Sequence, residues 1–147
     1  MKLLVVGDVH GCYYTLRHLI DQHWDPANTT LVQLGDLVNK GFHGGKALSY
    51  WMHLQQLYPG QVILLRGNHE QYMLQLQDSQ PDHKEYKQWE KELKIVGVAP
   101  GKALHWIRTS PLSYYCPQAI VSHAGIARSS PDPFQINRSD SVLYNRK

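Results

Sequence analysis

Short hydrophobic runs alternate with amphipathic segments along most of the chain. The runs at 3–6, 30–34 and 62–65 are rich in Leu, Val and Ile and carry no charge, a pattern typical of buried parallel strands. Segments 12–23 and 46–58 place apolar residues at helical spacing, which predicts helices packed on the sheet, and another helix is expected to reach about residue 77. This order predicts βαβ units and an α/β fold with a largely parallel sheet.

The second half of the chain is less regular. Residues 78–93 are polar and charged, with Tyr86, Trp89 and Leu93 on one helical stripe, and we expect an exposed helical cap there, with a role in substrate binding as the alternative. Three more elements are predicted after it: a helix over 102–108 and strands over 112–115 and 118–121. We interpret 1–147 as a single domain in which about 126–147 form a turn-rich tail.

A polar cluster follows each predicted parallel strand. The clusters are Gly7-Asp8-Val9-His10-Gly11, Gly35-Asp36-Leu37-Val38-Asn39-Lys40-Gly41 and Arg66-Gly67-Asn68-His69-Glu70. Alternate residues of an extended segment point to one face, so Asp8 and His10 can converge on one point. An Asp-x-His pair of this kind can supply two ligands of a metal site. The same pair also occurs where the two side chains are only hydrogen-bonded. Because ligands bind beyond the carboxyl ends of parallel strands, the three clusters predict a site at that edge of the sheet, and Ser122-His123-Ala124-Gly125 is a fourth cluster of the same kind.

Composition narrows the functional classes. The 147 residues are 42% hydrophobic and 18% charged, as in ordinary soluble globular proteins, and the net charge of +3 suits an anionic substrate such as a phosphate ester. The charge is too small, and basic stripes are too few, to predict nucleic-acid binding. Cys12 and Cys116 form no CxxC motif and are expected to be reduced thiols. No apolar run approaches the roughly 18 residues of a membrane span, so we predict a cytoplasmic protein that does not enter a membrane.

The four clusters together resemble a known family. Gly-Asp-Val-His-Gly, Gly-Asp-Leu-Val-Asn-Lys-Gly, Gly-Asn-His-Glu and Ser-His-Ala-Gly, in this order over 7–125, are similar to the motifs of the calcineurin-like metallophosphoesterases. Within them the chain resembles the branch of the phosphoprotein phosphatases and the ApaH diadenosine tetraphosphatases. The resemblance implies an α/β/β/α sandwich and a hydrolase that uses two divalent metal ions to cleave phosphate esters or phosphoanhydrides.

The resemblance also implies roles for individual residues. Asp8 and His10 would hold metal one, Asp36 would bridge, and Asn68 and His123 would hold metal two. Two cations roughly 3.5–4 Å apart generate hydroxide near neutral pH and stabilise both the attacking and the leaving oxygen. We expect Mn²⁺ first, although Fe, Zn and Mg tolerate the same ligands.

The remaining implied roles concern the substrate. His69 would act as general acid next to Asn39, and the phosphate would be held by Arg66, Lys40 and Arg146. The expected substrate is a phosphorylated small molecule, a nucleotide or a phosphoprotein. The sequence does not indicate an oligomeric state.

Two motif positions bear on the subfamily. Glu70 in Gly-Asn-His-Glu is usual in protein phosphatases, whereas Asn39-Lys40-Gly41 replaces their Asp-Arg-Gly and favours the ApaH-like phosphatases. Asn39 can accept a hydrogen bond from His69 through its carbonyl but carries no negative charge, so the imidazolium is less favoured. A polyphosphate leaving group is a weaker base than a serine alkoxide, and we therefore predict cleavage of a dinucleoside polyphosphate over phosphoserine.

The end of the sequence departs from the family pattern. Family members carry a further metal-two histidine downstream, but no histidine follows His123. We expect metal two to be held by Asp36, Asn68, His123 and water, with reduced occupancy and a C-terminally incomplete sandwich. A short variant, a fragment and completion by another chain all stay open, and His43 is an alternative ligand or a solvated loop residue. Other functions that stay open are a serine/threonine protein phosphatase and a catalytically weak domain that binds phosphate or a partner.

Overall fold

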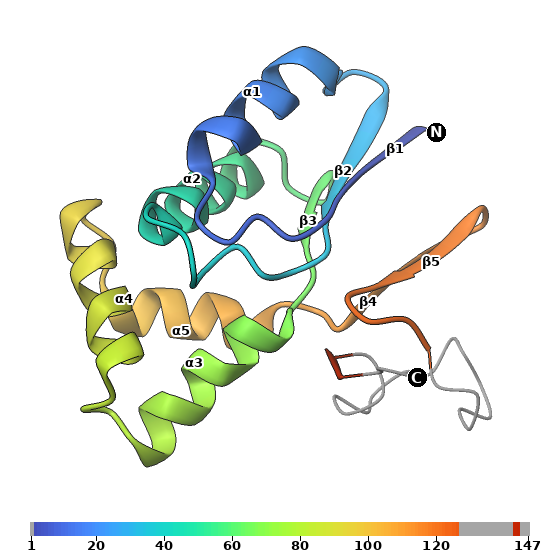
Figure 1. The fold of residues 1–147 in the computed structure, drawn as a ribbon. Coiled ribbons are helices and arrows are strands. Elements are labelled where there is room, and N and C mark those ends of the chain that lie inside the picture. Colours follow the sequence, from blue (N-terminus) through green and yellow to red (C-terminus); the bar gives the residue numbers. More distant parts are fainter. Residues whose placement is uncertain (1, 127–142, 145–147) are drawn as a thin grey trace.

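The computed structural model describes residues 2–126 and 143–144. In chain order its elements are β1 (Lys2–Val6), α1 (Tyr13–His23), β2 (Thr29–Gln33), α2 (Gly44–Leu57), β3 (Val62–Leu64), α3 (Asn68–Ser79), α4 (Lys84–Ile95), α5 (Pro100–Thr109), β4 (Ser113–Cys116) and β5 (Ala119–Ser122). The predicted alternation of strands and helices is confirmed (Figure 1).

The first three strands form a parallel sheet in the order β1-β2-β3. Central β2 is buried along its whole length, as its uncharged sequence predicts. In the register of the sheet, Gln33 pairs with Val6 on one side and with Leu64 on the other. The three strands therefore end side by side, and the polar clusters that follow them start from one edge of the sheet.

Gln33 is the last residue of β2 and shapes the turn that follows. Its side chain is fully buried, and its Oε1 accepts a 2.7 Å hydrogen bond from the Gly35 amide while its Nε2 donates to the Gly7 carbonyl at 3.1 Å. A buried amide with both ends paired fixes the backbone around it. Gln33 thus holds the starts of the first two polar clusters next to each other.

Helix α4 differs from the exposed cap predicted for 78–93. Tyr86, Trp89 and Leu93 lie on the predicted stripe but are buried, because α4 packs against α2. The approach is close enough that a Cβ on Gly45 would lie 2.5 Å from the Glu92 carbonyl oxygen. Gly44 and Gly45 precede the helix predicted over 46–58 but form the first turn of α2, where only glycine at position 45 allows this contact.

Strands β4 and β5 form a separate antiparallel hairpin, with Ser113 opposite Ser122. In Figure 1 the hairpin lies on one side of the parallel strands and helices α1 and α2 on the other. The fourth polar cluster therefore follows a strand of a second sheet, not a strand of the parallel sheet. Within the part of the chain that the structure describes, no helix is long and apolar enough to cross a membrane.

Candidate metal centre

A single carboxylate lies at the centre of the site. Asp36 is only 2% exposed, and its Oδ1 accepts a 2.9 Å hydrogen bond from the backbone amide of His69. Its Oδ2 faces three imidazole nitrogens: Nε2 of His10 at 3.6 Å, Nε2 of His123 at 3.6 Å and Nε2 of His69 at 4.0 Å. The three rings belong to different polar clusters, so the clusters meet around Asp36 above the ends of the strands.

Asp8 lies on the solvent side of the same centre. Its carboxylate oxygens are 3.6 Å from His10 Nε2 and 3.9 Å from His123 Nδ1. Two groups of potential metal ligands result, each with its ligand atoms within 4.8 Å of one another: His10, Asp36 and His69, and Asp8, Asp36 and His123. Asp36 belongs to both groups, as a bridging ligand would.

The histidine rings are oriented by backbone carbonyls. Nδ1 of His10 lies 3.2 Å from the Val38 oxygen and Nδ1 of His123 lies 2.9 Å from the Leu34 oxygen. A carbonyl only accepts, so each Nδ1 carries a proton, and Nε2 is the nitrogen left to bind a metal. This is the usual way in which a protein orients a metal-binding histidine.

Asn68 completes the predicted ligand set. Its Oδ1 lies 2.8 Å from Nε2 of His123, within hydrogen-bond distance, and Nε2 of His123 also faces Asp36. One cation could bind both atoms once Nε2 carries no proton. Carboxylate, amide oxygen and imidazole nitrogen are the donors that Mn²⁺, Zn²⁺ and related ions accept, and the residues present therefore fit a divalent metal.

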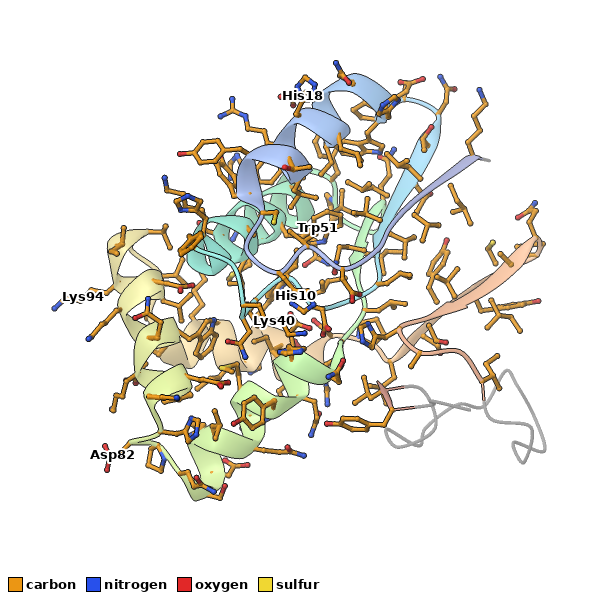
Figure 2. All side chains as sticks on the ribbon, viewed as in Figure 1. His10, His18, Lys40, Trp51, Asp82 and Lys94 are labelled. Carbon is orange, nitrogen blue, oxygen red and sulfur yellow. The ribbon has the colours of Figure 1, made fainter. Side chains whose placement is uncertain are left out.

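The structure brings together all five residues predicted as metal ligands: Asp8, His10, Asp36, Asn68 and His123. Their grouping is less separate than expected, because His123 approaches Asp8 as well as Asp36. His69, predicted as general acid, also lies within reach of Asp36. Figure 2 shows the position of His10 and Lys40 in the middle of the molecule, where the loops converge.

The backbone of two clusters is unusual. Every non-glycine residue with positive φ in the described part of the chain belongs to the first or second polar cluster: His10 (44°), Asp36 (59°), Asn39 (72°) and Lys40 (67°). Such residues are uncommon and cost free energy unless the surroundings hold them. Here the amides of Val9 and His10 both donate to the Asp36 carbonyl, at 3.0 and 2.8 Å.

Glu70 holds the second and third clusters together. It is fully buried, and its carboxylate accepts backbone N–H groups at 2.6–3.3 Å from Asp36, Leu37, Val38 and Gly67. Burial raises the pKa of the Glu70 carboxyl, as does the neighbouring Asp36, while the backbone donors favour the ionised form. Sequence analysis considered Glu70 only as a subfamily marker. Its place at the third helical position of α3, typical of a capping box, was the available signal.

Gly67 allows the third cluster to approach the second. A Cβ at this position would lie 2.3 Å from Asp36 Oδ1 and 2.4 Å from the Asp36 amide nitrogen. Gly67→Ala should therefore lower the free energy of unfolding by about 2 kcal/mol. Gly101→Ala is the matched control: nothing lies within 4 Å of its Cβ, and alanine in a helix should be neutral or stabilising by up to about 1 kcal/mol. Urea denaturation of both variants checks this, and equal stabilities would contradict it.

The surroundings of His69 correct one expectation. Nδ2 of Asn39, not its carbonyl, faces Nδ1 of His69 at 3.2 Å, because the same amide nitrogen donates to Glu85 Oε2 at 3.1 Å. Burial is the main cause of a lowered His69 pKa; His10 and Lys40 lower it further, while Asp36 and Glu85 oppose them. Glu85 was not among the predicted site residues, and nothing in its local sequence distinguishes it from other helix-surface glutamates.

Arg66 contacts the end of α5. Its Nε donates to the Ile107 carbonyl at 3.2 Å, and its two terminal nitrogens donate to Gln71 Oε1 at 3.0 Å and to the Ser110 carbonyl at 3.4 Å. Partial burial lowers the pKa of Arg66. These contacts give Arg66 a structural function, and its predicted phosphate binding stays a prediction.

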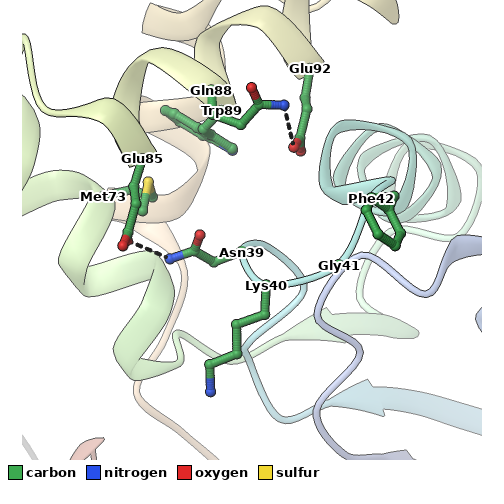
Figure 3. Close-up of a pocket in the computed structure, with 9 residues that line it drawn as sticks. All are labelled: Asn39, Lys40, Gly41, Phe42, Met73, Glu85, Gln88, Trp89 and Glu92. Atoms are coloured by element: carbon green, nitrogen blue, oxygen red, sulfur yellow. Dashed lines mark hydrogen bonds between the residues drawn. The ribbon is translucent and has the colours of Figure 1, made fainter.

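The other described residues predicted for the site are not among the ligand groups around Asp36. Lys40 is exposed and borders a pocket of about 280 Å³ whose wall also includes Phe42 and Trp89 (Figure 3). The ring of His43 packs edge-on against Tyr14, and His43 belongs to neither ligand group. Arg146 lies outside the described residues.

Comparison with known proteins identifies the family of the chain. The family model described as calcineurin-like phosphoesterase matches residues 1–145. A symmetrical bis(5'-nucleosyl)-tetraphosphatase from Dechloromonas aromatica is 30% identical over 129 residues, covering 86% of this chain and 44% of the relative. A PP2A-like serine/threonine-protein phosphatase from Candida albicans is 39% identical over 66 residues, covering 45% of this chain and 16% of the relative.

A solved structure described as a putative diadenosine tetraphosphatase has the same fold. Its TM-score is 0.65 at 24% identity, with 88% of this chain and 52% of that chain covered. The chain spans less than half the length of the two curated relatives above. Since the family model covers almost all of it, the chain belongs to the calcineurin-like phosphoesterase family.

Proposed function

We propose that the chain is a metal-dependent phosphohydrolase. The observation that carries this is the convergence of carboxylate, amide and imidazole ligands on the buried carboxylate of Asp36. The residues that would hold the ions are Asp8, His10, Asp36, Asn68 and His123. Two divalent cations bound there, with Mn²⁺ as first candidate, would supply hydroxide near neutral pH and neutralise charge on the reacting oxygens.

The chain's own side chains would orient the substrate and stabilise its leaving oxygen. His69 lies at the edge of the ligand cluster, 4.0 Å from Asp36 Oδ2, and could donate a hydrogen bond from Nε2 to the leaving oxygen. Lys40 is exposed on the loop between Asp36 and α2 and would attract the phosphoryl group as a point charge. The bonds from Val9 and His10 to the Asp36 carbonyl hold the loops in position without a substrate, which limits the reorganisation needed on binding.

We further propose that phosphoanhydrides are preferred over phosphoserine. An amide N–H of Asn39 points at Nδ1 of His69, an arrangement that suits a neutral ring. A neutral imidazole is a weaker proton donor than imidazolium, so it fits a leaving phosphate, which needs less protonation than a serine alkoxide. The tetraphosphatase relative supports this preference, and the phosphatase relative supports the alternative of a serine/threonine protein phosphatase.

The pocket beside Lys40 offers a place for the nucleoside part of the leaving nucleotide. Phe42 is 92% exposed and could stack on a base, while the carboxylates of Glu85 and Glu92 would repel a second phosphate. A dinucleoside tetraphosphate should therefore have a lower KM than an inorganic polyphosphate of the same length. Equal KM values would argue against a nucleoside contact here.

A substrate panel tests the proposal. The 147-residue chain, loaded in turn with Mn²⁺, Fe²⁺, Zn²⁺ and Mg²⁺, is assayed on a dinucleoside tetraphosphate, a polyphosphate, a phosphoserine peptide and p-nitrophenyl phosphate. We expect the highest kcat/KM on the tetraphosphate. A clear preference for the peptide would support a protein phosphatase instead. Metal binding without turnover on any substrate would identify a binding domain.

A further inference from the structure

Asn39 connects a helix outside the metal loops to His69. Its Nδ2 lies 3.1 Å from Oε2 of Glu85, on the first turn of α4, and 3.2 Å from Nδ1 of His69 (Figure 3 shows the bond between Asn39 and Glu85). An amide nitrogen has two N–H groups and only donates, so both partners must accept. Each can do so: Glu85 as a carboxylate, and His69 through an unprotonated Nδ1.

Glu85 determines which end of the amide faces the histidine. If the Asn39 amide were reversed, its oxygen would face the Glu85 carboxylate, and two acceptors would be in contact. With the amide in its observed orientation, Nδ1 of neutral His69 holds no proton, so the ring proton is on Nε2. That nitrogen lies on the side of Asp36, at 4.0 Å from Oδ2.

The position of Glu85 is itself fixed. Its backbone N–H donates to the His83 side chain at the start of α4, and the helix is anchored on the core by the buried Tyr86 and Trp89. A carboxylate in the first turn is also favoured by the positive end of the helix dipole. Glu85 is therefore held where it can orient Asn39 before any substrate binds.

We propose that Glu85 is a positioning residue: by fixing the Asn39 amide, it sets the tautomer of His69 that carries its proton on Nε2, toward the metal centre. The tautomer follows from the hydrogen bonds alone. Its use as a hydrogen-bond donor to the leaving oxygen rests on the proposed function.

Nitrogen NMR of the ¹⁵N-labelled, metal-free chain tests the tautomer directly, because an unprotonated imidazole nitrogen resonates far downfield of a protonated one. We expect a downfield Nδ1 and an upfield Nε2 signal for His69. Glu85→Gln should mix the two tautomers, since a glutamine can accept or donate and leaves Asn39 free to reverse. Glu90→Gln, on the same helix and bonded to Lys87, should leave the His69 signals unchanged. A protonated Nδ1 in the unsubstituted chain, or an unaltered tautomer in Glu85→Gln, would overturn the proposal.

A reciprocal exchange provides a second test. Asn39→Asp places two carboxylates in contact with each other, and should lower the Tm. Adding Glu85→Gln gives this carboxylate a donor, because the glutamine amide can donate to the aspartate at position 39. The double variant should therefore recover most of the lost Tm. The aspartate would also accept from His69, so the proton of His69 should be found on Nδ1. Failure of the second substitution to restore the Tm, or an unchanged tautomer, would exclude the coupling.

Kinetics link the tautomer to turnover. In Glu85→Gln, kcat should fall about fivefold on phenyl phosphate, whose strongly basic leaving oxygen is stabilised by a hydrogen bond from Nε2–H, with KM unchanged and little effect on p-nitrophenyl phosphate. An equal loss on both substrates would show that Glu85 does not act through the hydrogen bond from His69 to the leaving oxygen. If the unsubstituted enzyme turned over nothing, the proposed function would fail, while the tautomer would still be decided by the NMR signals.

Discussion

Asp36→Asn is expected to lower kcat by about a thousandfold, equivalent to about 4 kcal/mol of transition-state stabilisation. Asparagine keeps the shape of the side chain, tolerates the left-handed backbone at φ 59° and can still accept the His69 amide hydrogen through Oδ1. What is lost is the negative charge shared by both ligand groups. Titration calorimetry and metal analysis should show fewer than two bound divalent ions per chain, with urea denaturation reporting whether folding is preserved.

The control for this variant is Asp21→Asn. Asp21 is exposed on α1 and forms an ion pair with Arg17 at 3.7 Å, so its substitution removes one carboxylate without touching the centre. Metal stoichiometry and kcat should match those of the unsubstituted chain. Full metal binding and turnover in Asp36→Asn would show that the centre is not built on Asp36.

Glu70→Gln should lower the free energy of unfolding by about 4 kcal/mol. Each carboxylate oxygen of Glu70 accepts two backbone N–H groups, and whichever oxygen becomes an NH₂ group leaves two buried donors facing another donor. For a chain of this size the loss corresponds to a fall in Tm of about 8–16 °C, which scanning calorimetry can measure. The same variant should also weaken metal binding, because Glu70 binds the backbone amides of Asp36 and of the two residues that follow it, and so holds the Asp36 backbone in place.

Glu90→Gln serves as its control. Glu90 pairs with Lys87 at 3.0 Å on the outer face of α4, and exposed pairs of this kind contribute about 0–1 kcal/mol. Its Tm should stay within about 3 °C of the starting value. A similar small shift for Glu70→Gln would mean that the buried carboxyl acts as a neutral group, for which an amide is an adequate replacement.

The fold and the gathering of the clusters could be predicted because both depend on local sequence. A run such as Leu31-Val32 has no polar position to place in water, so a buried central strand follows directly. The parallel arrangement then brings the polar ends of the strands together. His123 follows a strand of the second sheet, and its place near Asp36 could be expected only from the family resemblance.

The other features depend on contacts between distant segments. Glu85 is 46 positions from Asn39, and neither residue carries a signal of the other, so the orientation of the Asn39 amide could not be predicted. For Arg66, the family resemblance implied phosphate binding, but carbonyls at the end of α5 take up most of its donors. Helix α4 is more buried than predicted, because the charged residues of its outer face dominate its composition and hide the buried stripe.

The left-handed residues of the second cluster have an evolutionary consequence. Asn39 and Lys40 adopt φ values of 72° and 67°, which glycine would adopt without strain. A laboratory selection for heat resistance alone would therefore favour glycine codons at both positions. It would remove the Asn39 side chain, which faces His69, and the Lys40 side chain, which we propose binds phosphate. Thermal tolerance and chemistry are expected to compete at these two codons, so thermostable descendants of this chain should be screened for turnover in every round.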